Sequence, residues 1–196
     1  MFLRNEGFCC ICDAPTTFVA RHPWLRDHYL RERCGTIPHA RAVVEVLHSI
    51  APDWELAIMH EGSPSTNHIA RRCPNYSYSF FYRDVPLGGQ KNGQRCENLG
   101  AMTFKDDSFD VFITQDVLED VFRPDRALSE IMRVLRPGGI HVFTAPKHKH
   151  LLSTVQRATV AADGAITHLL PPEYHAIRLT TPEAWSFGTT GPISAT

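Results

Sequence analysis

Residues 109–144 read FDVFITQDVLEDVFRPDRALSEIMRVLRPGGIHVFT, and this stretch predicts the class of fold. Val111-Phe112-Ile113 is a short apolar run typical of a buried strand, and Ile140 to Thr144 is another. A helix is predicted between them, from about Pro124 to Arg136, and Pro137-Gly138-Gly139 ends it. Its apolar stripe consists of Leu128, Ile131, Met132 and Leu135. Strands that alternate with helices across short turns predict an α/β fold, with a largely parallel sheet covered by helices on both faces.

Upstream of this stretch, the same reasoning predicts a helix, two strands and a loop. The helix begins near Pro38, because the fixed φ of proline suits a first turn. Its apolar stripe consists of Ala40, Val43, Val44, Leu47 and Ile50. Leu56-Ala57-Ile58-Met59 is predicted to be a buried strand, and His60 to Ser65 the polar turn after it. Tyr76 to Tyr82 is a second predicted strand, and Pro86 to Gly93 is a predicted loop.

Length and charge narrow the class of protein. The chain has 196 residues, of which 43% are apolar, and this content excludes wholesale disorder. The balance of 20 basic and 21 acidic side chains argues against a domain that holds nucleic acid by its phosphates. No apolar run approaches the roughly 18 residues that cross a bilayer, and the first residues contain no apolar core of a secretion signal. We therefore expect a soluble, cytoplasmic protein.

The six cysteines are spread unevenly along the chain. Four of them lie in the first fifth, at positions Cys9, Cys10, Cys12 and Cys34. In a cytoplasmic protein, such cysteines are more often thiols or metal ligands than disulfides. Their clustering predicts a cysteine-rich module over residues 1–38. The rest of the chain is predicted to form a core domain over 39–180 and a loosely structured tail over 181–196.

Residues 98–146 resemble, without a gap, class I S-adenosylmethionine-dependent methyltransferases of the type 11 kind. The resemblance rests on the segments Asn98 to Asp110, Ile113 to Val121 and Arg126 to Gly139, which arrive in the order and spacing of that family. It implies a Rossmann-like three-layer sandwich that binds S-adenosylmethionine. It also implies transfer of a methyl group to an oxygen, nitrogen or carbon nucleophile.

A narrower resemblance, to a subgroup with a cysteine-rich, zinc-ribbon-like N-terminus, covers most of the chain. Its features are Cys9-x-x-Cys12, Trp24-Leu25-Arg26-Asp27, Cys34-Gly35-Thr36-Ile37-Pro38 and Pro171-Pro172-Glu173-Tyr174-His175. The resemblance implies a structural zinc ion held by three thiolates, from Cys9, Cys12 and Cys34.

The zinc framework is incomplete, because Arg31 stands where the subgroup has a cysteine. The candidates for the fourth ligand are Cys10, His22 and His28. The alternative is that the module has lost its metal and that the cysteines are small buried apolar residues. The residue pattern leaves both hypotheses open.

The resemblance also assigns the contacts of the cofactor to the carboxyl ends of the strands, where open parallel sheets bind ligands. The turn after the first strand is Glu61-Gly62-Ser63-Pro64, with a single glycine. Glu61 would favour the positive charge of the cofactor by a charge-assisted contact. Gly62, Ser63 and Pro64 would let the backbone approach the amino-acid end of the cofactor.

Further contacts follow from the next strands. Ser79 stands where the family has an acid that holds the ribose, and it makes one hydrogen bond where a carboxylate makes two. Asn98 would accept a hydrogen bond from the adenine amino group, and Leu99 would lie against the adenine face. Gln115 and Asp116 would line the cavity beneath the reactive methyl group.

Candidates for acceptor positioning lie toward the C-terminus. Methyl transfer is an in-line displacement at an activated carbon, so the main task is to align the acceptor, and a general base is needed only for a protonated one. Tyr174 and His175 belong to the shared C-terminal segment and are candidates for a base or an orienting group. His148 follows the fifth strand and is a third candidate, with a solvated basic loop as the alternative.

Two hypotheses of function remain at this point. The first is an active methyltransferase with a small-molecule acceptor, no nucleic-acid or membrane partner, and a homodimer contact that covers a short core. The second is a degenerate fold that serves as a binding or scaffold protein. The departures at Ser79, Asn98 and Arg31 favour the second hypothesis, whereas Glu61 and Gln115 favour the first.

Overall fold

The computed structural model describes residues 2–64, 68–145, 153, 155–161 and 165–171. Contacts between residues divide the chain into two compact units. The N-terminal unit comprises residues 1–58 and 66–76, and the second unit comprises residues 59–65 and 77–196. The helix over residues 38–50 therefore belongs to the same unit as the cysteines. The domain boundary expected at residue 38 stays a prediction. None of the described helices is long and apolar enough to span a membrane.

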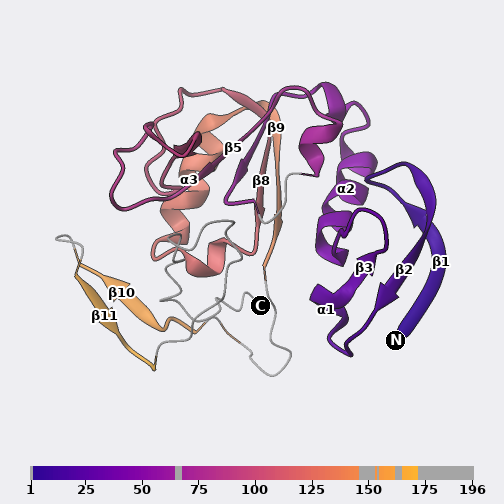
Figure 1. Cartoon of the computed structure of the whole chain (residues 1–196). Coiled ribbons are helices and arrows are strands. Elements are labelled where there is room, and N and C mark those ends of the chain that lie inside the picture. Colours follow the sequence, from indigo (N-terminus) through magenta and orange to yellow (C-terminus); the bar gives the residue numbers. More distant parts are fainter. Residues whose placement is uncertain (1, 65–67, 146–152, 154, 162–164, 172–196) are drawn as a thin grey trace. The chain divides into compact units, whose positions relative to one another are not determined.

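The N-terminal unit is a small antiparallel sheet with a helix. Strands β1 (Leu3–Cys9), β2 (Ala14–Ala20) and β3 (Tyr29–Arg31) pair in that order (Figure 1). The short helix α1 spans Leu25–His28, and α2 spans Pro38–Ile50. The predicted stripe of α2 is buried except for Ile50.

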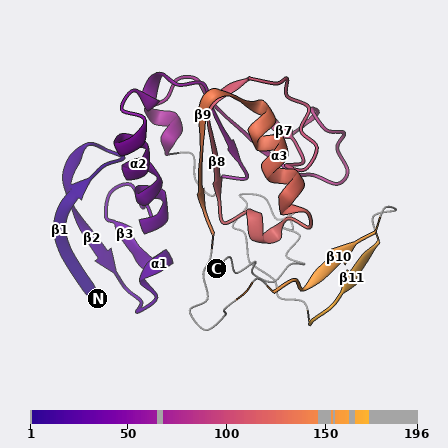
Figure 2. The same ribbon diagram turned by 180° about the vertical axis from the view of Figure 1, so that it is seen from behind.

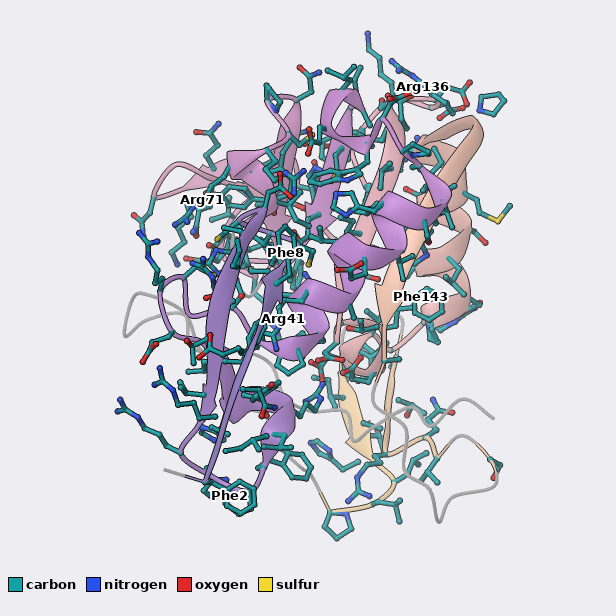
Figure 3. All side chains as sticks on the ribbon, turned by 90° about the vertical axis from the view of Figure 1, so that its right-hand side faces the viewer. Phe2, Phe8, Arg41, Arg71, Arg136 and Phe143 are labelled. Atoms are coloured by element: carbon teal, nitrogen blue, oxygen red, sulfur yellow. The ribbon has the colours of Figure 1, made fainter. Side chains whose placement is uncertain are left out.

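Arg41 of α2 ties this helix to the sheet. Its guanidinium lies 4.6 Å from the ring centroid of Phe18 and donates a hydrogen bond of 3.1 Å to the carbonyl oxygen of Tyr29 (Figure 3). Two 3₁₀ turns, η1 (Trp54–Leu56) and η2 (Ile69–Arg71), complete the unit.

The second unit contains a six-stranded sheet with the order β6-β7-β5-β4-β8-β9. The strands are β4 (Met59–Gly62), β5 (Tyr76–Phe80), β6 (Gln90–Lys91), β7 (Gln94–Cys96), β8 (Phe109–Gln115) and β9 (Leu135–Thr144). Three pairs, β5 with β7, β4 with β8 and β8 with β9, are parallel, and β6 is antiparallel to β7. This arrangement confirms the predicted α/β fold with a largely parallel sheet.

One helix and a separate hairpin accompany this sheet. Helix α3 (Pro124–Val134) follows the 3₁₀ turn η3 (Leu118–Asp120) and packs against β9 (Figure 2). Strands β10 (Ala158–Val160) and β11 (Ile166–His168) form a two-stranded antiparallel pair. The sequence contains no clear signal for that pair.

The prediction for the first parallel strand was wrong by three residues. The strand β4 begins at Met59, whereas Leu56 belongs to η1 and is 76% exposed. His60 and Glu61, which were predicted to lie in a polar turn, are fully buried strand residues. The prediction placed the strand on the apolar run 56–59, but the buried strand β4 carries the polar residues His60 and Glu61. Their side chains form hydrogen bonds with the two neighbouring strands, β5 and β8.

Two further predictions need correction. Helix α3 ends at Val134, and Pro137 to Gly139 belong to β9, which begins at Leu135, five residues before the predicted strand. The buried face of α3 consists of Ala127, Ile131 and Val134, whereas Leu128 and Met132 are exposed. The predicted loop after Pro86 contains β6, which turns back through Asn92 and Gly93, both with positive φ, as this tight turn requires.

His60 of β4 is held by two serines of the neighbouring strand. Its Nδ1 lies 2.8 Å from the Ser77 hydroxyl and its Nε2 lies 2.9 Å from the Ser79 hydroxyl. The rings of Phe104 and Phe109 pack on it at centroid distances of 4.7 and 4.9 Å. Burial, together with the positive charge of Arg95, lowers the pKa of His60 to about 3, so this side chain is neutral in the folded protein.

This neutral histidine should make the fold sensitive to acid. The unfolded chain binds a proton near the ordinary pKa of 6.5 and the folded chain does not, so stability falls as the pH is lowered. When the pH is lowered from 7.5 to 5.5, the free energy of unfolding should fall by about 1.4 kcal/mol because of His60 alone. Urea denaturation at the two pH values should show that His60→Gln removes this part of the pH dependence.

The exposed His28 provides the matched control, because His28→Gln should keep the wild-type difference between the two pH values. His141, whose pKa burial lowers to about 4, acts with the same sign and is present in every variant. An unchanged pH dependence in His60→Gln would contradict the prediction.

Candidate cofactor site and cysteine cluster

The carboxyl ends of β4 and β8 meet at one edge of the sheet. These strands are parallel neighbours, with Glu61 opposite Ile113 and Gly62 opposite Thr114. The Gln115 amide nitrogen donates a hydrogen bond of 2.6 Å to the Glu61 carboxylate, and both residues are buried. The structure therefore brings together two of the predicted cofactor residues, from segments that are 54 residues apart.

Gly62 leaves room for Leu99 at this edge. A Cβ atom on Gly62 would lie 3.1 Å from a methyl carbon of Leu99 and 3.6 Å from the methyl of Thr114. Leu99 comes from the segment after β7, where the Asn98 side-chain oxygen accepts a hydrogen bond of 2.9 Å from the Gly100 amide. Since an amide oxygen has two lone pairs, Asn98 keeps the capacity to accept a second hydrogen bond.

Both strands leave the sheet through a residue in the left-handed conformation. Ser63 has a φ of 53°, and its amide donates a hydrogen bond of 2.7 Å to the Ser79 carbonyl. Asp116 has a φ of 51°, and its amide lies 3.1 Å from the carbonyl oxygen of Thr144 on β9. These turns fix where Pro64 and the chain after Asp116 depart from the sheet.

The residues at this edge suit a positively charged amine. Within the described part of the chain, the Gln115 side-chain oxygen is buried without a hydrogen-bond partner. It belongs to the same side chain that binds the Glu61 carboxylate. A buried carboxylate beside an unused amide acceptor favours an ammonium or sulfonium group, because each would supply the missing charge or donor.

Ser79 does not join this group. It is 3% exposed, and its hydroxyl lies against His60 inside the sheet. Glu97, the buried acid after β7, is used within its own segment. It accepts hydrogen bonds from Arg95 at 2.7 Å and from the Thr103 amide and hydroxyl at 2.9 and 2.6 Å. Neither residue is placed to hold the two hydroxyls of a ribose.

The N-terminal unit brings three cysteines together. The sulfur atoms of Cys9, Cys12 and Cys34 all lie within 4.8 Å of one another. Cys9 ends β1, Cys12 lies in the turn to β2, and Cys34 follows β3. Three thiol groups at this spacing fit the donor set of a zinc site.

The thiols of Cys12 and Cys34 differ in acidity. Burial and a hydrogen bond with Cys34 raise the pKa of Cys12 to about 11. Burial also acts to raise the pKa of Cys34, but its hydrogen bonds with Thr36, one of them 3.2 Å between Sγ and Oγ1, bring it below the ordinary value. Cys34 is therefore the thiol that ionises more readily.

None of the predicted fourth ligands joins the three cysteines among the described residues. The Cys10 thiol donates a hydrogen bond of 3.5 Å to the Arg41 carbonyl, and burial raises its pKa to about 12. The rings of His22 and His28 contact each other at a centroid distance of 4.8 Å. Arg31, in the place of the missing cysteine, is 4% exposed.

Comparison with known proteins identifies the central part of the chain. Residues 84–143 match the model of the methyltransferase domain family. This match covers less than a third of the chain. It includes β6 to β8, helix α3 and all but the last residue of β9, and therefore the residues Asn98, Leu99, Gln115 and Asp116.

Two solved structures illustrate the similarity. An S-adenosylmethionine-dependent methyltransferase from Mesorhizobium loti is 17% identical, covers 66% of this chain and 64% of its own, and has a TM-score of 0.41. A SAM-dependent methyltransferase from Methanosarcina mazei is 23% identical, with 54% and 59% covered and a TM-score of 0.39. The chain thus spans less than two thirds of each structure. None of the curated protein sequences matches it.

The acceptor-positioning residues predicted for the methyltransferase domain, Tyr174, His175 and His148, lie outside the described residues. Sequence reasoning missed Thr114, whose hydroxyl lies 2.9 Å from His141 and whose methyl borders the space at Gly62. It also missed Thr144, which holds the turn at Asp116. Their position at strand ends was the one available signal.

The contact between Glu61 and Gln115 generates a test of the stability of the second unit. Gln115→Leu removes a donor from a buried carboxylate, so the free energy of unfolding should fall by about 1–3 kcal/mol. Gln90→Leu, on the exposed edge strand β6, is the matched control and should change it by no more than about 0.5 kcal/mol. Equal effects in urea denaturation would show that Gln115 does not stabilise Glu61.

Proposed function

We propose that this protein is an S-adenosylmethionine-dependent methyltransferase with a small-molecule acceptor. One observation carries the proposal: the buried pair of Glu61 and Gln115, at the joint end of β4 and β8, where the Gln115 oxygen lacks a partner among the described residues. The match of residues 84–143 to the methyltransferase domain family supports it.

The proposed roles follow from the chemistry of this edge. Glu61 and the Gln115 oxygen attract the positively charged amino-acid end of the cofactor. Gly62 leaves room for the Leu99 side chain at this edge, and the turn through Ser63 and Pro64 borders the same end. Bound S-adenosylmethionine supplies a methyl group already activated by a sulfonium.

The other predicted residues complete the binding site. The oxygen of Asn98 accepts a hydrogen bond from the adenine amino group, and the Leu99 side chain packs against the ring. Asp116 lines the space beneath the methyl group, beside the end of β9. Tyr174 and His175 remain the proposed residues for orienting the acceptor.

A titration with S-adenosylmethionine tests this assignment. Glu61→Gln removes a charge-assisted contact, so the dissociation constant should rise roughly tenfold to a hundredfold. Asn98→Ala removes a neutral hydrogen bond and should raise it roughly three- to tenfold. Glu32→Gln removes an exposed carboxylate of the other unit and should leave it unchanged.

A specific observation supports a second candidate, a fold that has lost catalysis and serves as a binding protein. The Ser79 hydroxyl is used by His60, and the Glu97 carboxylate is used by Arg95 and Thr103. The described residues at these two strand ends therefore offer no free carboxylate for a ribose. The absence of calorimetric heat and of a thermal shift at millimolar cofactor would favour this candidate over the enzyme.

We propose further that Cys9, Cys12 and Cys34 hold a zinc ion in the N-terminal unit. The mutual distances of their sulfur atoms and the readily ionised Cys34 support this site. The fourth ligand does not come from Cys10, which uses its thiol at Arg41, and an external ligand such as water would complete the tetrahedral shell.

Metal analysis of the purified chain tests the zinc site. The wild-type protein should contain about one zinc ion per chain, and Cys34→Ser should lose most of it, because two thiolates and a solvent ligand hold zinc weakly. Cys73→Ser is the matched control, since this buried thiol of the same unit donates to the Ala57 carbonyl instead. Equal zinc contents in the two variants, measured by plasma mass spectrometry, would contradict the assignment.

A further inference from the structure

The N-terminal unit contains a cavity that the proposed activity does not use. Its volume is about 410 Å³, within the range of small-molecule sites. The lining consists of Cys12, Ala14, Arg31, Arg33, Cys34 and Arg71. Half of these residues are arginines, and none of them is acidic.

Arg31 is the unusual member of this lining. It is 4% exposed, and its Nε is buried without a hydrogen-bond partner among the described residues. A buried guanidinium is costly unless it is paired, because it loses its hydration. The cavity lining around Arg31 contains no carboxylate, so these residues offer its guanidinium no counter-charge, and an anionic ligand would supply one.

Arg33 and Arg71 add two exposed guanidinium groups from separate segments. Arg33 follows β3, and Arg71 ends η2, more than thirty residues later in the chain (Figure 3). Neither forms an ion pair in the described part of the protein. The neighbouring Arg72 differs, because it pairs with Glu55 and donates to the Cys10 carbonyl.

We propose that this cavity binds the phosphate group of a small molecule, through Arg31, Arg33 and Arg71. A guanidinium presents planar pairs of N–H donors that match the oxygens of a phosphate, and three of them neutralise its charge. A zinc ion on three thiolates would carry a net charge of −1, so the cavity would remain positive with the metal in place.

The shape of the site favours a small ligand over a nucleic acid. The three arginines line one concavity, whereas nucleic-acid surfaces extend a basic stripe along many phosphates. The chain as a whole has a net charge of −1, which gives no such stripe. This inference is independent of the methyltransferase proposal, because it concerns residues of the other unit.

Calorimetric titration of the full chain with inorganic phosphate tests the site, at constant ionic strength. Arg33→Gln and Arg71→Gln should each raise the dissociation constant about tenfold, the effect of one lost charge-assisted contact. Both residues are exposed, so the variants should fold. Arg21→Gln, an exposed arginine of the same unit outside the lining, is the matched control and should bind phosphate as the wild type does.

Three comparisons make the result decisive. Phosphate should bind to the zinc-loaded and the chelator-treated protein, and succinate should bind more weakly than phosphate. The affinity for S-adenosylmethionine should be the same in all three arginine variants. Equal phosphate binding in the control and the cavity variants, binding that requires zinc, or a preference for a single-stranded oligonucleotide would each overturn the proposal.

Discussion

Two consecutive polar side chains, buried side by side in one strand, constrain the whole second unit. His60 and Glu61 of β4 point to opposite faces of the sheet, as neighbours in a strand must, so each needs its own partners. The Ser77 and Ser79 hydroxyls of β5 meet His60, and the Gln115 amide of β8 meets Glu61. The order of strands on both sides of β4 is therefore tied to the satisfaction of two buried groups.

The same constraint places the candidate cofactor site. Glu61 lies next to the end of its strand, and Gly62 and Ser63 follow immediately, so the buried carboxylate is also at the edge where the chain turns away. The parallel pairing with β8 brings Gln115 to the same edge. In the proposed site, the Gln115 amide nitrogen stabilises Glu61, and the Gln115 oxygen, which has no partner among the described residues, would contact the ligand.

The N-terminal unit places a buried cation beside a cluster of thiols. Arg31 occupies the position of a missing cysteine, beside the Cys12 and Cys34 thiols that its positive charge influences. Instead of a fourth thiolate, the cluster has a buried cation at the wall of a cavity. Thiols suit a metal ion and guanidinium groups suit an anion, so the two proposed sites would lie side by side in this unit.

The sequence by itself determined the alternation of strands and helices, the start of α2 at Pro38, the strand at Val111 and the end of that strand at Gln115. Periodicity and the fixed φ of proline are local properties, which explains why these predictions held. Only the tertiary structure decided that His60 and Glu61 are strand residues, that Ser79 faces inward, and that Arg71 joins Arg31 and Cys34. Burial of a polar group depends on hydrogen-bond partners that are 17, 19 or 54 residues away in the sequence. No local sequence pattern predicts that the fold brings these partners into contact.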